Sequence, residues 1–213
     1  MTQNTLRGIG GALAALVCLS VPAAELKLTP SEIDQAHLYL DQTRNGVIGA
    51  TKGLSEAQWK FKPAPDRWSI AEIVEHMVVV QELVLGPVRE QLAKTPVVSA
   101  DRDYKHVDAV IVNQIPDRLQ KFHAPEMLQP SGRWEPSVAL DRLLKNYARL
   151  SEYLDSTPDL RQHLVDAPPL KAVSRGAYDS MDGYQWVLAA AAHTERHTKQ
   201  ILEVKADPNF PAK

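Results

Sequence analysis

The amino-acid sequence predicts an all-α protein folded as a four-helix bundle. Four stretches repeat apolar residues at intervals of three and four positions, which is the period of an amphipathic helix. Three of these stretches open with a capping-box pattern, in which a side chain that accepts at the N-cap is followed three residues later by Glu or Gln. No stretch alternates polar and apolar residues clearly enough to predict a strand.

The first helix is predicted to begin in the segment "LTPSEIDQ". Thr29 is a suitable N-cap, Pro30 suits the first helical position, and Glu32 can complete a capping box. The apolar pattern continues to residue 54, although three glycines weaken its second half. The segment 55–68 contains two prolines and is predicted to be an irregular connection.

The second helix is predicted over residues 69–92, with Ser69 and Glu72 as its capping box. Pro87 should kink or break this helix near Leu85. The β-branched run "VVVQELVLGPV" is also compatible with a strand, but the cap and the length favour a helix. Short helical pieces are expected in 103–122, between proline-rich segments.

The third helix is predicted over residues 136–156, where leucines and Tyr147 form one apolar face. A connection over 157–182 shows no clear periodicity, and loops of this length are usually functional or mobile. The fourth helix is predicted from Asp182, capped with Gln185, to about residue 204.

Residues 1–23 have the charge pattern, apolar run and small-residue end of a secretory signal peptide. Cleavage before Ala24 would leave a single domain of residues 24–213, and we expect it in the periplasm. An uncleaved N-terminal anchor is the alternative. A lipoprotein signal at Cys18 is disfavoured because Val17 precedes it, where a small residue is usual.

Composition excludes several classes of function. The single cysteine, Cys18, lies in the predicted signal, so the mature chain has no disulfide, cysteine nucleophile or thiolate metal site. The net charge of −2 does not suggest a nucleic-acid partner. No second apolar segment reaches the roughly 20 residues of a membrane span. The expected partners are a small-molecule ligand or substrate and, as a candidate assembly, a second copy of the chain.

Histidines on predicted core faces are the candidate metal ligands. His193 and His197 lie four residues apart, in phase with the apolar residues Trp186 and Ile201, so both rings should point into the bundle. His76 lies on the apolar side of the second helix. One histidine from the second helix and two from the fourth would make a three-histidine site with coordination positions left open.

Other assignments stay open on this evidence. His37, on the first helix, is a rival third ligand, and the inward histidines could instead be hydrogen-bonded structural residues without metal. The remaining histidines, in proline-rich or loop regions, are predicted to lie at the surface: His106, His123 and His163.

The segment "HTERH" is not the zinc-protease motif HExxH. Glu195 stands two residues after His193, about 200° around the helix, and should point away from both rings. Arg196 and Lys199 are predicted to form a solvated face.

Two segments carry a family resemblance. "DRWSIAEIVEHM" (66–77) and "AAAAHTERHTKQIL" (189–202) resemble the second and last helices of the DinB-like superfamily. The resemblance extends over about residues 31–204. It implies a bundle with up-down-down-up topology and a divalent metal bound by His76, His193 and His197. The proline-rich stretch 95–135 agrees with this topology, because parallel neighbouring helices need a long crossover.

The function expected from these observations is that of an exported, metal-dependent enzyme, a hydrolase or transferase, with zinc or nickel as the metal. The alternative is a noncatalytic periplasmic bundle that binds metal or ligand. Characterised DinB-like proteins include transferases that use low-molecular-weight thiols, but such thiols are cytoplasmic, and the expected export argues against that chemistry.

Catalytic residues are not identified by the sequence. Glu72 faces roughly toward His76, although its capping role is the simpler explanation. Side chains in or after the 157–182 connection could line the mouth of a site, namely Tyr178, Asp179 and Tyr184. Trp186 and Val80 are expected to line the pocket itself.

Overall fold

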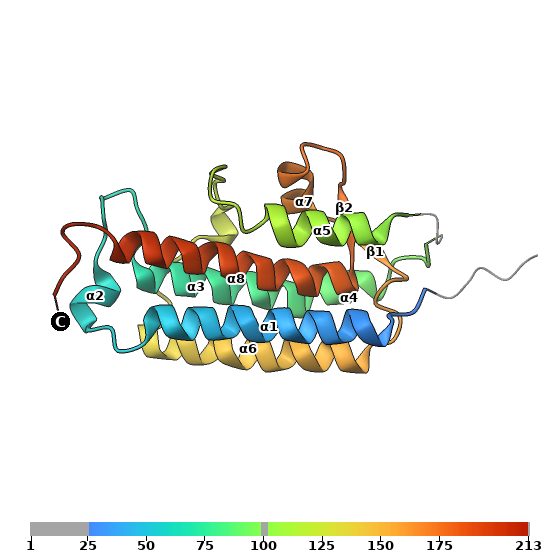
Figure 1. The fold of residues 1–213 in the computed structure, drawn as a ribbon, viewed down its shortest axis with the longest axis horizontal. Helices are drawn as coiled ribbons and strands as arrows, with labels where there is room; N and C mark the ends of the chain where they lie inside the picture. Colours follow the sequence, from blue (N-terminus) through green and yellow to red (C-terminus); the bar gives the residue numbers. More distant parts are fainter. Residues whose placement is uncertain (1–25, 99–101, 213) are drawn as a thin grey trace, which may run out of the picture.

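The computed structural model describes residues 26–98 and 102–212, and the predicted signal peptide lies outside them. Within these residues four long helical rods pack side by side (Figure 1). Their bounds are α1 (Pro30–Thr51), α3 (Ile70–Leu83) with its continuation, α6 (Pro136–Ser156) and α8 (Gly183–Lys205). In Figure 1, α1 and α8 run from right to left, whereas α3 and α6 run from left to right. The predicted four-helix bundle with up-down-down-up topology is therefore confirmed.

Local sequence signals set where the helices begin. The backbone amide of Thr29 donates to Glu32 Oε2 at 2.8 Å, and that of Ser69 donates to Glu72 Oε2 at 2.7 Å. At the start of α8, the amide of Gln185 donates to Asp182 Oδ1 at 2.7 Å. All three predicted capping boxes are present, and each satisfies amides that a helix terminus would otherwise leave without partners.

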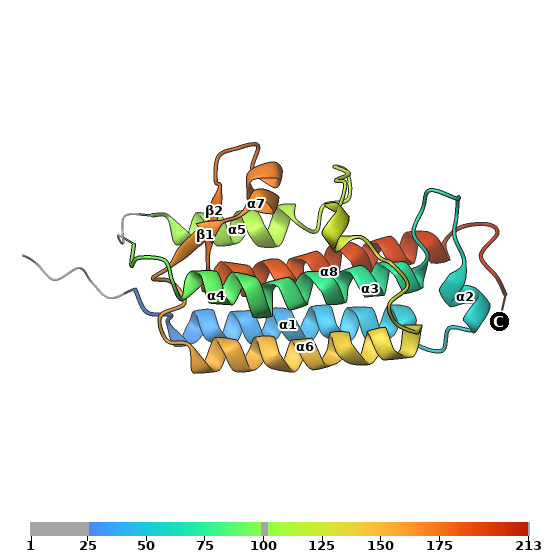
Figure 2. The same ribbon diagram turned by 180° about the vertical axis from the view of Figure 1, so that it is seen from behind.

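Pro87 does not break the second helix. The chain passes from α3 through a π-helical turn, η1 (Val84–Val88), into α4 (Arg89–Leu92), and the three form one continuous rod (Figure 2). Proline lacks the amide proton and collides with the preceding turn of an α-helix, so a locally widened turn accommodates it. The predicted irregularity is thus present, but as a π-helical turn rather than an end.

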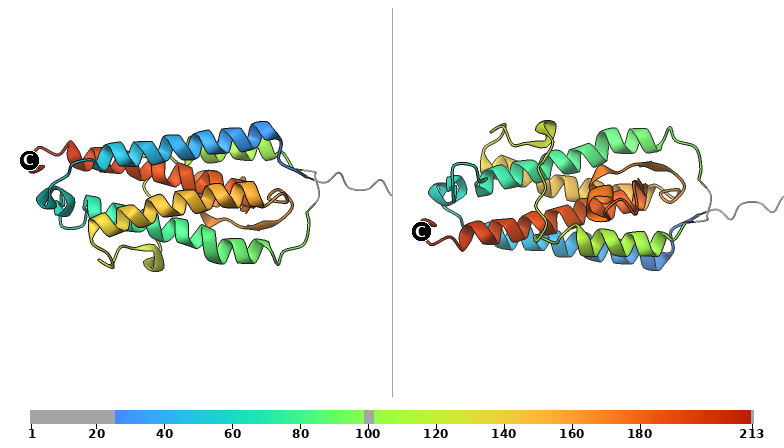
Figure 3. Two further views of the ribbon diagram at one scale, coloured as in Figure 1. Left: turned by 90° about the horizontal axis from the view of Figure 1, so that it is seen from below. Right: turned by 90° about the horizontal axis from the view of Figure 1, so that it is seen from above.

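Because α3 and α6 are parallel, the chain must travel back along the bundle between them. It does so through α5 (Tyr104–Gln114), which packs on α8, and then through a segment that contains the short 3₁₀-helix η2 (Glu126–Leu128). The right panel of Figure 3 shows this segment passing across α8 and α3 before it reaches α6. We call residues 115–135 the crossover segment. It covers the faces of the two helices that carry the candidate ligands.

Four short elements were not expected from the sequence. They are α2 (Glu56–Lys60), β1 (Leu164–Asp166), α7 (Pro168–Val173) and β2 (Ser180–Asp182). The strands pair antiparallel, with Val165 opposite Met181, so the 157–182 connection is not an irregular loop. Three residues are too few to show a period of two, which explains why no strand was predicted.

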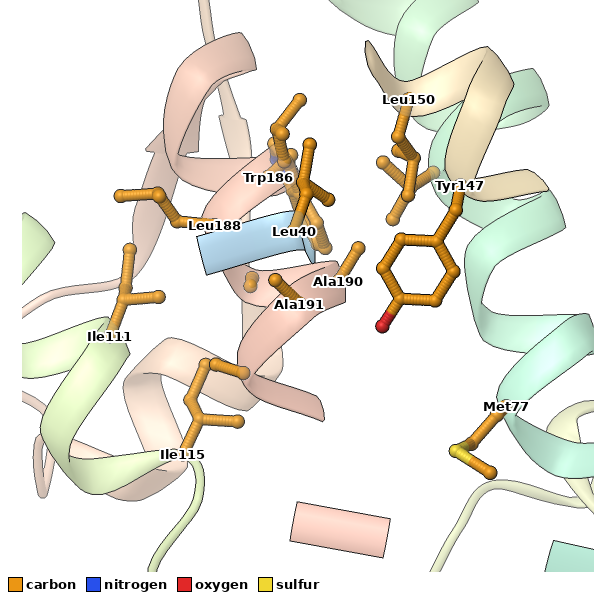
Figure 4. Close-up of a cluster of buried hydrophobic side chains, with 14 of the residues drawn as sticks. Leu40, Met77, Ile111, Ile115, Tyr147, Leu150, Trp186, Leu188, Ala190 and Ala191 are labelled. Atoms are coloured by element: carbon orange, nitrogen blue, oxygen red, sulfur yellow. The ribbon is translucent and has the colours of Figure 1, made fainter. Parts of the chain in front are cut away.

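The first half of α8 lies in the middle of the molecule. Every residue from Gly183 to Ala192 is buried, as expected for a helix that packs on several sides. Figure 4 shows Ile111 of α5 and Ile115, which directly follows α5, on one side of α8, with Tyr147 and Leu150 of α6 on the other. This packing fixes the rotation of α8 about its axis, and hence the direction of the histidines in its second half. Among the described residues, no helix is both long and apolar enough to cross a membrane.

Candidate metal centre

Three histidines converge between α3 and α8. His76 comes from α3, His193 and His197 come from successive turns of α8, and their candidate ligand nitrogens all lie within 4.8 Å of one another. Nε2 of His76 and Nε2 of His193 are 3.1 Å apart. The rings of His193 and His197 have centroids 4.3 Å apart, as the spacing of four residues along a helix requires.

Hydrogen bonds on the far sides of two rings hold them in place. His76 Nδ1 lies 2.7 Å from the carbonyl oxygen of Leu128 in the crossover segment. A carbonyl can only accept, so Nδ1 of His76 carries the proton and its Nε2 presents a lone pair to the centre. His197 Nδ1 lies 2.8 Å from Oε1 of Gln200. Partners of this kind orient metal-binding imidazoles in proteins.

Hydrogen bonds among the three rings do not satisfy every imidazole nitrogen of the cluster. The positions of the ring protons therefore allow the fit of a cation to be tested. With a lone pair on His76 Nε2, the 3.1 Å contact requires the Nε2 proton of His193 to lie between the rings. That tautomer leaves His193 Nδ1 as a bare lone pair, and Nδ1 is buried without a hydrogen-bond partner among the described residues. Tetrahedral zinc bound at 2.0–2.1 Å separates its nitrogen ligands by about 3.3 Å. The 3.1 Å separation of the Nε2 atoms of His76 and His193 is thus close to the separation required by an ion bound to both, which would take the place of the bridging proton. Nδ1 of His193 would then carry the proton, and it is buried without an acceptor among the described residues.

The environment keeps the imidazoles neutral. Burial is the main cause that lowers the pKa of all three rings, and it places the pKa of His193 and of His197 well below the usual value. The proximity of the rings adds to the effect, since a charge on one disfavours a charge on its neighbours. Neutral imidazole is the form that binds metal ions.

Trp68 forms an aromatic wall beside the histidines. Its ring centroid lies 4.9 Å from that of His76 and 6.4 Å from that of His197, nearly parallel to the latter. The sequence prediction did not single out this residue, although it lies in the segment "DRWSIAEIVEHM" directly before the N-cap Ser69. Of the two residues expected to line the pocket, Trp186 belongs to the buried core (Figure 4), and Val80 is half-buried one turn beyond His76.

The crossover segment is fastened over the centre from both sides. On α3, the buried carboxylate of Glu75 accepts hydrogen bonds from the backbone amides of Ser131 at 2.8 Å and Gly132 at 2.9 Å. On α8, Arg196 donates to backbone carbonyls of the crossover segment, including that of Ile115 at 3.3 Å. The prediction that Arg196 is solvated is wrong, since only 6% of it is exposed. Helical phase alone could not reveal the segment that covers this face of α8.

The acidic residues near the histidine ligands form hydrogen bonds and ion pairs with other groups. Glu195 accepts a hydrogen bond from Tyr39 of α1 at 2.8 Å and pairs with Lys199, so it points away from the rings as predicted. Glu72 completes the cap of α3 and pairs with Lys62 at 2.9 Å. Neither carboxylate is directed at the histidine cluster.

The other candidate residues lie away from the centre. His37 binds Asp155 at 2.7 Å and Ser151 at 2.9 Å, between α1 and α6. The Tyr184 hydroxyl donates to the carbonyl of Glu32 near the start of α8, about 13 Å along that helix from His193.

The remaining candidates have other surroundings. The Tyr178 ring packs against His106 rather than at the mouth of the centre. His106 and His123 are exposed, as predicted, whereas His163 is half-buried and bonds to the carbonyl of Thr95 at 2.7 Å.

Comparisons with known proteins establish the fold and the family of the chain. YfiT from Bacillus subtilis, described as a probable metal-dependent hydrolase with an unusual four-helix bundle topology, is similar in structure with a TM-score of 0.56. The similarity covers 86% of this chain and 91% of YfiT at 12% sequence identity, so it concerns the fold. The uncharacterized protein YuaE of Bacillus subtilis (strain 168) is 21% identical over 155 residues, which are 72% of this chain and 87% of YuaE. The sequence profile of the DinB superfamily matches residues 39–201, and the chain therefore belongs to the DinB superfamily.

Proposed function

We propose that the protein is a metal-dependent hydrolase whose divalent ion is held by Nε2 of His76, His193 and His197. The observation that carries the proposal is the convergence of three neutral imidazoles, with ligand nitrogens within 4.8 Å of one another. Three protein ligands leave at least one coordination position for water or substrate, which distinguishes catalytic from structural zinc sites. The fold shared with YfiT, a probable metal-dependent hydrolase, supports hydrolysis over group transfer.

The side chains around the centre orient the histidine ligands and shield them from water. When bound, a divalent ion supplies Lewis acidity, which activates water and polarises a carbonyl or phosphoryl oxygen. Hydrogen bonds to Leu128 and Gln200 hold His76 and His197 with Nε2 toward the centre. Trp68 shields the rings on one side and offers an apolar face to a substrate. An all-imidazole ligand set favours zinc or nickel over magnesium or calcium.

A noncatalytic metal- or ligand-binding bundle is the second candidate. It is favoured by the engagement of the neighbouring carboxylates, because Glu72, Glu75 and Glu195 each bind other groups in the described structure. A hydrolase here would have to rely on the ion itself, without one of these carboxylates as general base.

Hydrolysis of chromogenic esters, amides and phosphoesters separates the two candidates. The protein is assayed free of metal and after reconstitution with zinc or nickel, with His193→Ala as the control. We expect turnover of at least one substrate class by the reconstituted protein, and none by the metal-free protein or the variant. Stoichiometric metal binding without turnover of any class would favour the binding bundle.

We further propose that the protein acts in the periplasm after removal of residues 1–23. The proposal rests on the charge, apolar run and small-residue end of this segment. N-terminal sequencing of the protein from a periplasmic extract tests it, and we expect the mature chain to begin at Ala24. Recovery of full-length chain from the cytoplasm alone would contradict export.

A further inference from the structure

We propose that Gln200 is a positioning residue that fixes the ring tautomer of His197, and that Arg118 in turn fixes Gln200. The metal-binding part of this inference rests on the proposed function, whereas the tautomer itself is a property of the metal-free protein. The inference identifies two residues outside the histidine cluster that determine whether His197 can act as a ligand.

Gln200 is placed beside His197 by the helix. The two residues are three positions apart on α8, so their side chains lie on the same face. His197 Nδ1 and Gln200 Oε1 are 2.8 Å apart. This contact alone does not define the tautomer, because an amide rotated by 180° presents a donor in place of the acceptor.

Arg118 removes this ambiguity. Its Nη1 lies 3.4 Å from the same Gln200 oxygen. A guanidinium group carries only donors, so a rotated amide would bring its own N–H groups against those of Arg118. The acceptor oxygen therefore faces both Arg118 and His197, and Nδ1 of His197 must donate. Its Nε2 is left as a lone pair, which is the form that a metal ion requires.

Arg118 is itself held firmly. Its Nε and Nη2 donate to the two carboxylate oxygens of Glu203 at 3.0 and 2.7 Å, a bidentate pair with restricted geometry. Glu203 lies on α8 three positions after Gln200, whereas Arg118 belongs to the crossover segment. The chain of contacts from Glu203 through Arg118 and Gln200 to His197 links the placement of that segment to the lone pair of one ligand.

His76 provides an internal reference for the test. Its tautomer is set by the backbone carbonyl of Leu128, which no substitution at 118 or 200 removes. Ring nitrogen chemical shifts of metal-free protein labelled with ¹⁵N-histidine therefore report His197 and His76 in the same spectrum. We expect both rings of the unsubstituted protein to be protonated at Nδ1.

The decisive variants are Gln200→Met, Gln200→Glu and Arg118→Met, with Gln42→Met on the exposed face of α1 as the matched control. Gln200→Met should give a mixture of His197 tautomers, leave His76 unchanged, and weaken zinc binding by about 10–100-fold. Arg118→Met should act in the same direction by about tenfold or less. Gln200→Glu keeps an acceptor and should retain or strengthen zinc binding, and Gln42→Met should change nothing.

Two other outcomes would contradict the positioning role of Gln200 or the proposed function, and the experiment separates them. If Gln200→Met keeps a pure Nδ1–H tautomer at His197 and the zinc affinity of the unsubstituted protein, the positioning role is wrong. If the unsubstituted protein binds no zinc, the proposed function fails, while the chemical shifts still decide the tautomer assignment.

Discussion

The Nε2 atoms of His76 and His193 lie 3.1 Å apart, although the residues are separated by 117 positions in the sequence. Their proximity results from the antiparallel packing of α3 against α8, whose rotation is fixed by the buried residues Gly183–Ala192. Two lone-pair nitrogens at this distance repel unless a proton or a cation lies between them. In the metal-free protein the Nε2 proton of neutral His193 lies in this gap, and a bound cation would take its place.

Loss of one ligand should greatly weaken metal binding. His193→Ala removes one of three imidazoles and should lower the zinc affinity by at least about a hundredfold, because even indirect contacts to such ligands contribute 10–100-fold. His37→Ala is the matched control, since this histidine bonds to Asp155 and Ser151 rather than to the cluster. Competition with a metal-sensitive dye measures both affinities, and equal losses in the two variants would argue against the ligand set.

Glu75 should be essential for the placement of the crossover segment. Glu75→Ala leaves the backbone amides of Ser131 and Gly132 without their buried acceptor. We expect the free energy of unfolding to fall by about 3 kcal/mol, as measured by urea denaturation. Glu152→Ala, an exposed change on α6, should alter it by less than about 0.5 kcal/mol. Similar midpoints for both variants would show that Glu75 is not an anchor.

Gly183 is required by a close approach at the start of α8. A Cβ atom there would lie 2.5 Å from Leu160 Cδ2 and 3.2 Å from both the Leu160 carbonyl oxygen and the Tyr153 hydroxyl. Gly183→Ala should therefore destabilise the protein by about 1–3 kcal/mol. Gly49→Ala in α1 meets no atom within 4 Å and should stabilise it by about 0.5–1 kcal/mol. Thermal unfolding compares them, and midpoints shifted in the same direction would refute the steric argument.

A buried ion cluster joins several elements at the end of the bundle where α8 begins. The Arg161 guanidinium lies 2.6 Å from Asp108, 2.7 Å from Glu32 and 3.0 Å from Asp182. Burial, reinforced by the charge of Asp108, raises the pKa of Asp182 from 3.8 to about 6 despite the contact with Arg161. Folding therefore favours the protonated form of Asp182.

The sign of the resulting pH dependence follows from proton linkage. Between pH 4 and pH 6 the folded chain binds more protons at Asp182 than the unfolded chain does, so the contribution of this group to stability falls as the pH rises. Asp182→Asn keeps a cap residue for α8 but does not titrate. We expect the stability of the unsubstituted protein relative to this variant to decrease from pH 4 to pH 7, measured by urea denaturation. An increase over this range would contradict the raised pKa.

Features with strong local signals could be predicted from the sequence. The capping boxes at Thr29, Ser69 and Asp182 fix the starts of α1, α3 and α8, because they depend on residues only three positions apart. The inward direction of His193 and His197 follows from helical phase. The order and direction of the helices came instead from the resemblance to a family.

Features that depend on tertiary contacts could not be predicted. The burial of Arg196 and the contact between Gln200 and Arg118 both depend on where the crossover segment lies. Trp68 stands beside His197 because the connection before α3 folds back on α8, which no periodicity shows. The strands β1 and β2 pair across 13 intervening residues and are too short for a recognisable pattern.

Metal analysis of the untagged mature protein tests the central claim most directly. The protein is incubated with zinc and nickel, freed of excess ion and measured by mass spectrometry with an inductively coupled plasma. We predict about one equivalent of one of these metals per chain, and its loss in His197→Ala. Less than about a tenth of an equivalent in the unsubstituted protein, or equal metal content in the variant, would contradict the three-histidine centre.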